Sequence, residues 1–475
     1  MIALISWKNI WRNKLRSLVV MISMAIGIFG GIFAVSIMNG FVEDRTKMVL
    51  DNEIAHIQIH NEQFLENNEP RYTLSDKGFI DSLLKNTAEI KNYTYRTRLT
   101  GMANTPAATA GINIIGIDPA TEIHVSGLHK TLLANTGNYL EPGSTNKILI
   151  GKKLAESLKL TEYIITDSAL QLLSKATNDK QMLTVLTLVK DSLFRSEKDF
   201  VKMLETKLTK DQLMKHKTAI KNTSVKYKLR NKIIITTQNS QGNLVGGAFR
   251  IAGIYNSENA LFDAQNVFFL HTDIEILTGY SLCFPHEVAI KLTDIKHSQT
   301  VSEVLKPKLE NTAVETWKSL QPEIAFYTDF MDFYNLIIIG FILASLAFAI
   351  VNTMLMVVLE RVKELGMLMA IGMNKRRVFY MIMLETIFLS LTGAVVGMLI
   401  AAYAIHHFGQ VGLHFSQYAE GFEAMGYKSS VYPAIGLGFY FTVAFLVIIT
   451  GIAASIYPAR KALKLNPADA IRSDI

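Results

Sequence analysis

The stretch that decides the fold is LIIIGFILASLAFAIVNTMLMVVL, residues 336–359, which holds no charged side chain. It is longer than the ~20 residues that an α-helix needs to cross the hydrocarbon of a bilayer. Similar apolar runs lie at 18–38, 378–405 and 434–457, and a long polar stretch separates the first run from the second. This layout predicts an α-helical membrane bundle of four transmembrane helices with one large domain outside the bilayer.

Basic residues gather beside these runs and indicate the orientation. The chain has a net charge of +7, whereas the segment 406–433 is slightly acidic. Because Lys and Arg favour the inner side of a membrane, we expect both termini and 360–377 inside, and the large domain and 406–433 outside. The residues that carry this expectation are Lys8, Arg12, Lys14, Arg16, Arg361, Lys363, Lys375, Arg376, Arg377, Arg460, Lys461, Lys464 and Arg472.

The first run has the basic start of a signal peptide, but it exceeds the usual 7–15 apolar residues, which favours a retained anchor. The predicted organisation follows the runs. It comprises an amphipathic helix at 1–17, transmembrane helices at 18–40, 334–359, 378–405 and 434–457, an outer domain with stalks at 41–333, an inner loop at 360–377, an outer loop at 406–433 and an inner tail at 458–475.

The outer domain shows the patterns of an α+β fold. Alternating apolar residues at 54–60 and 93–102 predict strands. Segment 161–230 contains neither Gly nor Pro and has helical periodicity, so we expect two or three helices inserted into the sheet domain. Residues 238–247, which contain three glycines, predict the turn of a hairpin.

No residues of the outer domain form a nucleophile, base and acid grouping, and the sequence holds no G-x-x-x-x-G-K-[ST] nucleotide loop. We therefore expect no enzyme activity, catalytic residue or metal, and no cofactor bound by this chain. His56, Gln58 and His60 share one face of a predicted strand, for which a solvated sheet face is expected and a metal site is the alternative. Cys283, the single cysteine, is expected to be a buried apolar residue.

Small residues and one acid mark the apolar runs. Gly27, Gly31, Gly393 and Gly397 would let helices approach closely in lipid. Glu385 lies in the third run, where a carboxylate is costly. We expect it to contact Arg376, Arg377 or the first run, and so to stabilise the bundle.

The inner loop ERVKELGMLMAIGMNKRR, residues 360–377, predicts a short charged helix between two spans. Glu360 and Glu364 share one face, and Gly366 and Gly372 permit bends. Leu365, Leu368 and Met369 are expected to form an apolar patch. A helix of this kind can pass force between a soluble motor and the bilayer.

The pattern E-R-x-x-E-L-G-x-x-x-A-x-G at 360–372 resembles the coupling loop of FtsX-like, MacB-type permeases of ABC transporters. SWKNIWRNKLR at 6–16 and YPARKALKLNPADAIR at 457–472 resemble the entry and exit motifs of that family. The resemblance implies a MacB-type periplasmic core domain, the bacterial inner membrane, a second permease and a cytoplasmic ATPase that holds ATP–Mg. The residues that would contact the ATPase are Glu360, Arg361, Glu364, Leu365, Gly366, Ala370 and Gly372.

Within the family, AHIQI at 55–59 is similar to lipoprotein-releasing permeases of the LolC/LolE type. That resemblance implies a lipoprotein substrate and a periplasmic carrier, which the turn residues Asn239, Gln241, Gly242 and Asn243 would recruit. Two alternatives stay open: export of periplasmic small molecules or peptides as by MacB, and mechanical activation of cell-wall hydrolases as by FtsX. Membrane lipids are expected partners and nucleic acid is not.

Overall fold

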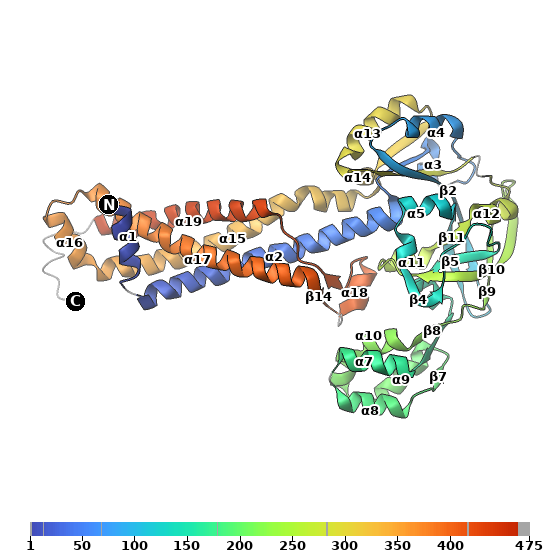
Figure 1. The fold of residues 1–475 in the computed structure, drawn as a ribbon, viewed down its shortest axis with the longest axis horizontal. Helices are drawn as coiled ribbons and strands as arrows, with labels where there is room; N and C mark the ends of the chain where they lie inside the picture. The colour runs from blue at the N-terminus through green and yellow to red at the C-terminus, as the bar shows by residue number, and fades with distance from the viewer. Residues whose placement is uncertain are drawn as a thin grey trace. The chain divides into compact units, whose positions relative to one another are not determined.

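The structure is a computed structural model of the full chain, and it describes residues 2–12, 14–67, 69–177, 179–281, 284–415 and 418–463. Cys283 and tail residues 464–475, including Lys464 and Arg472, lie outside the described residues. The chain divides into two compact units. The helical unit comprises Met1–Glu43, Tyr327–Leu413 and Val431–Ile475, and the head unit comprises Asp44–Phe326 and His414–Ser430 (Figure 1).

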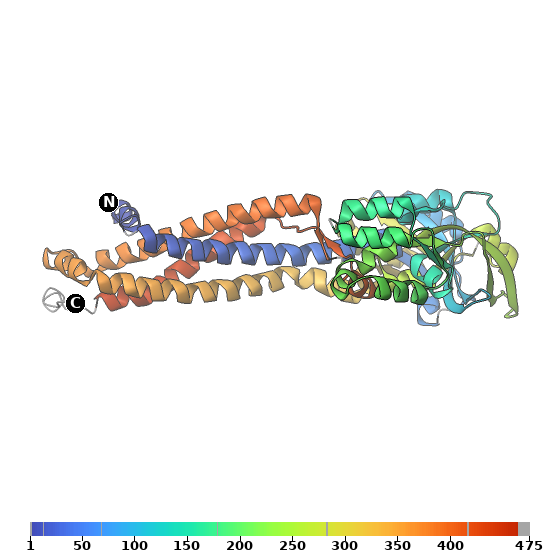
Figure 2. The ribbon, with the colours of Figure 1, turned by 90° about the horizontal axis from the view of Figure 1, so that it is seen from below.

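The helical unit is built from four long helices that run side by side in both ribbon views (Figures 1 and 2). They are α2 (Lys14–Met48), α15 (Pro322–Glu360), α17 (Lys375–Val411) and α19 (Leu437–Leu463). All four are long and apolar enough to cross a membrane, which confirms the predicted bundle. Two short helices, α1 (Ile2–Ile10) and α16 (Val362–Ala370), complete this unit.

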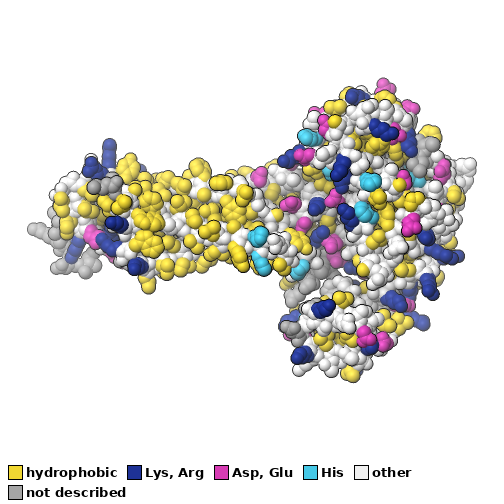
Figure 3. Space-filling model, viewed as in Figure 1, with side chains coloured by type: hydrophobic (Ala, Val, Ile, Leu, Met, Phe, Trp, Pro, Cys, Tyr) yellow, Lys and Arg dark blue, Asp and Glu magenta, His cyan; other side chains and the backbone are white. Residues whose placement is uncertain are grey.

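The surface of the helical unit fits a lipid environment. Hydrophobic side chains cover its visible face, and Lys and Arg gather at the end that carries α1 and α16 (Figure 3). Inside, Met24, Ile28 and Ile32 of α2 and Val443 and Val447 of α19 belong to one buried cluster. The chain is therefore a multi-pass membrane protein.

The head unit contains a ten-stranded mixed sheet, which confirms the α+β prediction. The order is β13-β1-β12-β2-β3-β11-β5-β10-β4, and β9 pairs with both β10 and β2. The strands are β1 (Ile57–Asn61), β2 (Ile90–Asn104), β3 (Thr109–Ile117), β4 (Leu132–Gly137), β5 (Lys147–Gly151), β9 (Lys232–Gln238), β10 (Leu244–Tyr255), β11 (Asn266–Leu270), β12 (Glu287–Leu292) and β13 (Thr312–Thr316). The helices around them include α3 (Glu62–Asn67), α4 (Lys77–Lys85), α5 (Pro119–Val125), α6 (Lys152–Ser157), α11 (Ala260–Gln265), α12 (His271–Thr278), α13 (Ser298–Leu305) and α14 (Trp317–Leu320).

The insertion at 161–230 folds as a small lobe with its own buried cluster. It has four helices rather than the expected two or three: α7 (Asp167–Ala176), α8 (Lys180–Leu188), α9 (Glu197–Lys207) and α10 (Lys210–Ser224). A three-stranded sheet of β6 (Thr161–Ile164), β7 (Leu193–Phe194) and β8 (Val225–Tyr227) joins them. The extra helix arises because Thr166, Asp179, Ser196 and Thr209 each cap a helix start through a side-chain oxygen, which satisfies otherwise unpaired backbone N–H groups.

The segment His414–Ser430, between α17 and α19, belongs to the head unit and carries α18 (Ala419–Ala424). Glu423 of α18 lies 4.0 Å from the ammonium group of Lys152 and 3.6 Å from that of Lys153. Lys428 lies 3.5 Å from Glu258. The outer loop that the sequence predicts at 406–433 is therefore an attached part of the head, and α17 continues to Val411 before it begins.

Candidate functional site: the inner loop and its ion pairs

The inner loop folds as a helix held between two transmembrane helices. α15 ends at Glu360, and α16 covers Val362–Ala370. Gly372 then adopts a φ of +99°, a conformation that L side chains rarely adopt. Asn374 caps α17, since its side-chain oxygen accepts a hydrogen bond from the backbone N–H of Arg376 at 3.0 Å. These residues turn the chain back into the bilayer.

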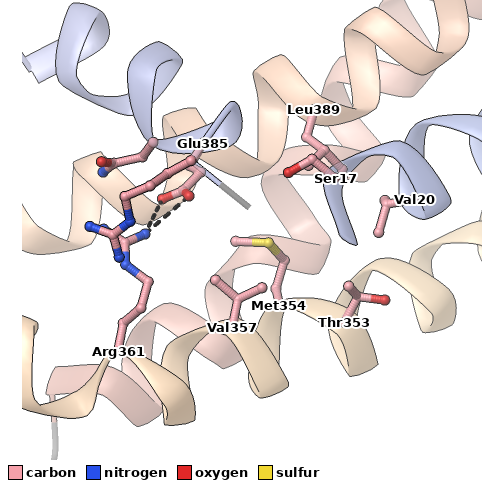
Figure 4. A pocket seen from close by; sticks show the side chains of 10 residues that line it. Ser17, Val20, Thr353, Met354, Val357, Arg361, Glu385 and Leu389 are labelled. Carbon is pink, nitrogen blue, oxygen red and sulfur yellow. Dashed lines mark hydrogen bonds and ion pairs between the residues drawn. The ribbon is translucent and has the colours of Figure 1, made fainter. Parts of the chain in front are cut away.

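Four charged side chains link α16, α17 and the segment after α1, and we call them the ion-pair chain. Arg12, just beyond α1, donates to both carboxylate oxygens of Glu364 at 2.6 and 2.7 Å. Arg361 donates from Nε to Glu364 at 3.0 Å and from Nη1 to both oxygens of Glu385 at 3.1 Å (Figure 4). The chain therefore ties α16 to α17 and to the N-terminal segment.

Burial rises along the ion-pair chain. The side chains of Arg12 and Glu364 are 49% and 45% exposed, whereas those of Arg361 and Glu385 are 12% and 6% exposed. Burial alone would raise the pKa of Glu364, but the hydrogen bonds from Arg12 and Arg361 outweigh it and lower that pKa. Glu364 is thus held as a carboxylate, the form that accepts the hydrogen bonds of Arg12 and Arg361.

Glu385 has a partner other than the one expected from the sequence. The prediction named Arg376, Arg377 or the first run, but the structure pairs Glu385 with Arg361. Helix geometry explains the difference, because Arg376 lies two and a half turns before Glu385 and so on the opposite face of α17, about 13 Å along the axis. Arg376 and Arg377 are both exposed.

The helix α16 has one buried and one exposed apolar face. Leu365 is 2% exposed and belongs to the core of the bundle, against which Leu368 and Met369 also pack. These three residues thus form the predicted apolar patch, and it faces the core of the bundle. The exposed face instead carries Met367, Ala370 and Ile371, with Met367 57% and Ile371 79% exposed.

The remaining inner-loop residues divide between these two faces. Gly366 is buried beside Leu365, whereas Glu360 and Gly372 are exposed. Sequence reasoning missed Met367 and Ile371. The signal was available, because residues four apart share one helix face and both apolar sets follow that spacing. Only the contacts show which set is covered.

The four predicted packing glycines lie where helices meet. A Cβ on Gly27 would lie 2.9 Å from Leu346, and one on Gly31 would lie 2.8 Å from Ile342, both on α15. A Cβ on Gly393 would lie 2.7 Å from the Cβ of Met24, and one on Gly397 would lie 2.5 Å from the backbone oxygen of Ala25. α17 therefore meets α2 with backbone close to backbone.

The predicted partner loop lies in the head unit as the tight turn between β9 and β10. The side-chain oxygen of Asn239 accepts hydrogen bonds from the N–H groups of Gln241 at 3.0 Å and Asn243 at 2.8 Å. Gly242 has a φ of +82°. Asn239 is thus engaged within the turn, and Gln241, Gly242 and Asn243 form its exposed tip.

The strand residues His56, Gln58 and His60 do not form a solvated face. Gln58 and His60 are 3% and 2% exposed, because β1 lies between β12 and β13 and is covered on both faces. His60 pairs with Gln58 at 2.9 Å, and the N–H of Leu292 donates to His56 at 3.1 Å. Among the described residues, no group of three His, Cys, Asp or Glu is placed to hold a metal.

Residues 336–467 match the family model described as FtsX-like permease C-terminal. This part of the chain is therefore similar to FtsX-like permeases. The matched span runs from the start of the second apolar run, through Arg361, Glu364 and Glu385 of the ion-pair chain, into the C-terminal motif. The chain is also similar to proteins whose names combine an ATP-binding part with a permease part.

Three comparisons illustrate this similarity. The macrolide export ATP-binding/permease protein MacB of Neisseria gonorrhoeae is 26% identical over 237 residues, which are 47% of this chain and 34% of the relative. MacB of Chlorobium luteolum is 31% identical over 123 residues, 26% of this chain and 16% of the relative. The pyoverdine export protein PvdT of Pseudomonas entomophila is 34% identical over 125 residues, 26% of this chain and 16% of the relative.

The permease thus spans between 16% and 34% of the length of these curated relatives. Among solved structures, the extracellular domain of the transporter YknZ covers 55% of this chain at 10% identity, with a TM-score of 0.29 and 99% of its own chain aligned. The periplasmic region of MacB from Actinobacillus actinomycetemcomitans covers 57% at 11% identity, with a TM-score of 0.29 and 92% of its own chain aligned.

Proposed function

We propose that this permease is the membrane subunit of an ABC transporter, in which ATP hydrolysis by a separate cytoplasmic ATPase moves the head unit. The observation that carries the proposal is the ion-pair chain beside the exposed apolar face of α16. That arrangement offers a partner a small apolar surface on a helix fixed to α17 and to the N-terminal segment. The sequence has no nucleotide-binding loop of its own, so the partner would supply ATP–Mg.

The predicted coupling residues would then have three separate roles. Met367, Ala370 and Ile371 form the contact surface, with Glu360 and Gly372 at its edges. Arg361 and Glu364 hold α16 at a fixed angle through the ion-pair chain. Leu365 and Gly366 anchor it to the core of the bundle. A push on the exposed face would reach α17 through Arg361 and Glu385.

The cellular setting that the family suggests is the bacterial inner membrane, with both termini in the cytoplasm, the head unit in the periplasm and a second permease as partner. Two cargoes remain as proposals. Lipoprotein release is favoured by AHIQI at 55–59. Export of a small molecule from the periplasm is favoured by the relatives that are named for macrolide and pyoverdine export.

The coupling role is tested by purifying the permease in detergent together with the ATPase that accompanies it, identified by mass spectrometry. We expect Met367→Glu/Ile371→Glu to reduce the bound ATPase at least tenfold, because charges replace the apolar contact. Glu364→Lys should keep the protein in the membrane but abolish its stimulation of ATP hydrolysis, since Lys cannot accept from Arg12 and Arg361.

The matched control is Leu188→Glu/Met214→Glu, which places the same two charges at residues of the lobe that are 82% and 75% exposed. It should retain the ATPase. If the double variant is folded by thermal unfolding and still binds the ATPase as the native permease does, the assigned contact surface is wrong.

A further inference from the structure

The head unit has a groove of about 530 Å³ between α4, the first half of β2 and the start of α5. Side chains that recur at regular spacing on α4 and on β2 line its two long walls. Lys77, Asp81 and Lys85 are four residues apart and share one face of α4. Lys91, Tyr93 and Tyr95 alternate along β2 and share one face of the strand. The groove therefore combines three lysines and two tyrosines.

The carboxylates that line the groove are occupied by the protein itself. Asp81 accepts hydrogen bonds on a single oxygen from the hydroxyl groups of Tyr93 at 2.9 Å and Tyr95 at 2.7 Å. Asp118 caps α5, since it accepts from the N–H of Ala120 at 3.1 Å and from the hydroxyl of Thr121 at 3.3 Å. Both acids thus have structural roles at the walls.

The lysines of the groove lack such partners. The ammonium group of Lys77 lies 4.5 Å above the ring of Tyr95, a cation–π contact that orients the charge. Lys85 and Lys91 are exposed. Among the described residues, no carboxylate lies within 4.0 Å of the ammonium group of Lys77, Lys85 or Lys91. Ammonium groups without protein acceptors are donors for an external anion.

We propose that this groove binds a small organic anion that carries carboxylate or phosphate groups. Its volume lies within the range of roughly 300–1,000 Å³ that is usual for small-molecule sites. Lys77 is held in place by Tyr95, which Asp81 holds in turn, whereas Lys85 and Lys91 adapt to the ligand from opposite walls. The site lies in the head unit and does not depend on the coupling role of α16.

The test is isothermal titration calorimetry of the full chain in non-ionic detergent at low ionic strength, with glycerol 3-phosphate and citrate as probes. We expect at least one probe to give saturable heat. Lys85→Ala/Lys91→Ala should weaken that binding at least tenfold. The matched control is Lys202→Ala/Lys207→Ala, which removes two exposed lysines of the lobe and should leave the isotherm unchanged.

Lys77→Gln provides a second test in case the double variant unfolds. It keeps the size and hydrogen-bonding capacity of the side chain and should also weaken binding tenfold, without a change in thermal unfolding. Absence of saturable heat with both probes would overturn the proposal. An equal loss of binding in the lobe control would also overturn it, because the heat would then report general attraction to lysines.

Discussion

Glu385 shows how a single buried charge is made tolerable in this bundle. Its carboxylate is 6% exposed and receives two hydrogen bonds from one guanidinium nitrogen of Arg361. A buried ion pair adds little net stability when both charges are present, but removing one partner leaves the other charge unpaired. The pair is therefore best understood as a positional link between α16 and α17.

This reasoning gives a double-mutant prediction. Glu385→Leu should destabilise the protein by about 1–3 kcal/mol, because Arg361 loses its buried partner and keeps only its bond to the half-exposed Glu364. Arg361→Leu/Glu385→Leu should recover most of that loss. Thermal unfolding of the purified variants in one detergent measures both effects. A double variant as unstable as Glu385→Leu would mean that the pair is not the source of the cost.

The double variant also separates stability from coupling. If the pair transmits motion, Arg361→Leu/Glu385→Leu should be stable and yet fail to stimulate the associated ATPase. Conservation of full stimulation in the double variant would show that force reaches α17 by another route.

At the scale of elements, the contact of α2 with α17 is set by glycine. Gly393→Ala should destabilise the bundle by about 1–3 kcal/mol, the usual cost of overpacking, because the new Cβ would lie 2.8 Å from the backbone oxygen of Met21 and 2.7 Å from the Cβ of Met24. Thermal unfolding in detergent again provides the measurement.

Two other glycines serve as matched controls. A Cβ on Gly30 of α2 or on Gly340 of α15 would meet nothing within 4 Å. Gly30→Ala and Gly340→Ala should be neutral or stabilising, since alanine favours a helix over glycine by up to about 1 kcal/mol. If all three substitutions behave alike, the contact of α17 with α2 does not depend on glycine.

At the scale of the whole molecule, buried titratable groups of the head unit respond to pH in opposite directions. Burial lowers the pKa values of His60 and His271 to about 4. Both are thus neutral in the folded protein, whereas in the unfolded chain they take up protons as pH falls from 6.5 towards 4. The free energy of unfolding therefore decreases over this range. Burial raises the pKa of Asp263 to about 7. Its folded form stays protonated where the unfolded form ionises, so stability falls as pH rises from about 4 to 7.

Asp263→Asn isolates the second effect. Asparagine can keep an oxygen for the N–H and hydroxyl of Ser257, which donate to Asp263 at 3.0 and 2.6 Å, but it carries no charge. We expect the variant to unfold about 2–4 °C above the native protein at pH 8, which corresponds to about 1 kcal/mol, and the difference to shrink at pH 5. An equal difference at both pH values would contradict the assigned ionisation.

The sequence predicts those features of this molecule that depend on contiguous residues. The four membrane helices follow from composition, and the short helix between the second and third of them follows from a local charged and apolar pattern. The partner of Glu385, the inward face of Leu365 and the pairing of Arg12 with Glu364 depend on contacts between segments that are far apart in the chain, so no local pattern encodes them. Membrane orientation and the ATPase partner stay predictions.

Two other features differ between the prediction from sequence and the structure: the number of helices in the lobe and the burial of β1. The fourth helix of the lobe was indicated by Thr166, Asp179, Ser196 and Thr209, which are typical capping residues. Burial of Gln58 and His60 could not be inferred from alternation, because alternation predicts a solvated face only when one face of the sheet is uncovered. β1 lies inside a sheet that is covered on both faces.

The backbone contact of Gly397 with Ala25 also sets the order of assembly during synthesis. The two residues are separated by the main segment of the head unit, Asp44–Phe326, and by α15 and α16. At the usual 5–20 residues per second, a ribosome needs about 20–70 s to make the intervening chain. The first membrane helix must therefore remain in the bilayer without its permanent neighbour for that time, and the bundle cannot close until the last third of the protein has been translated.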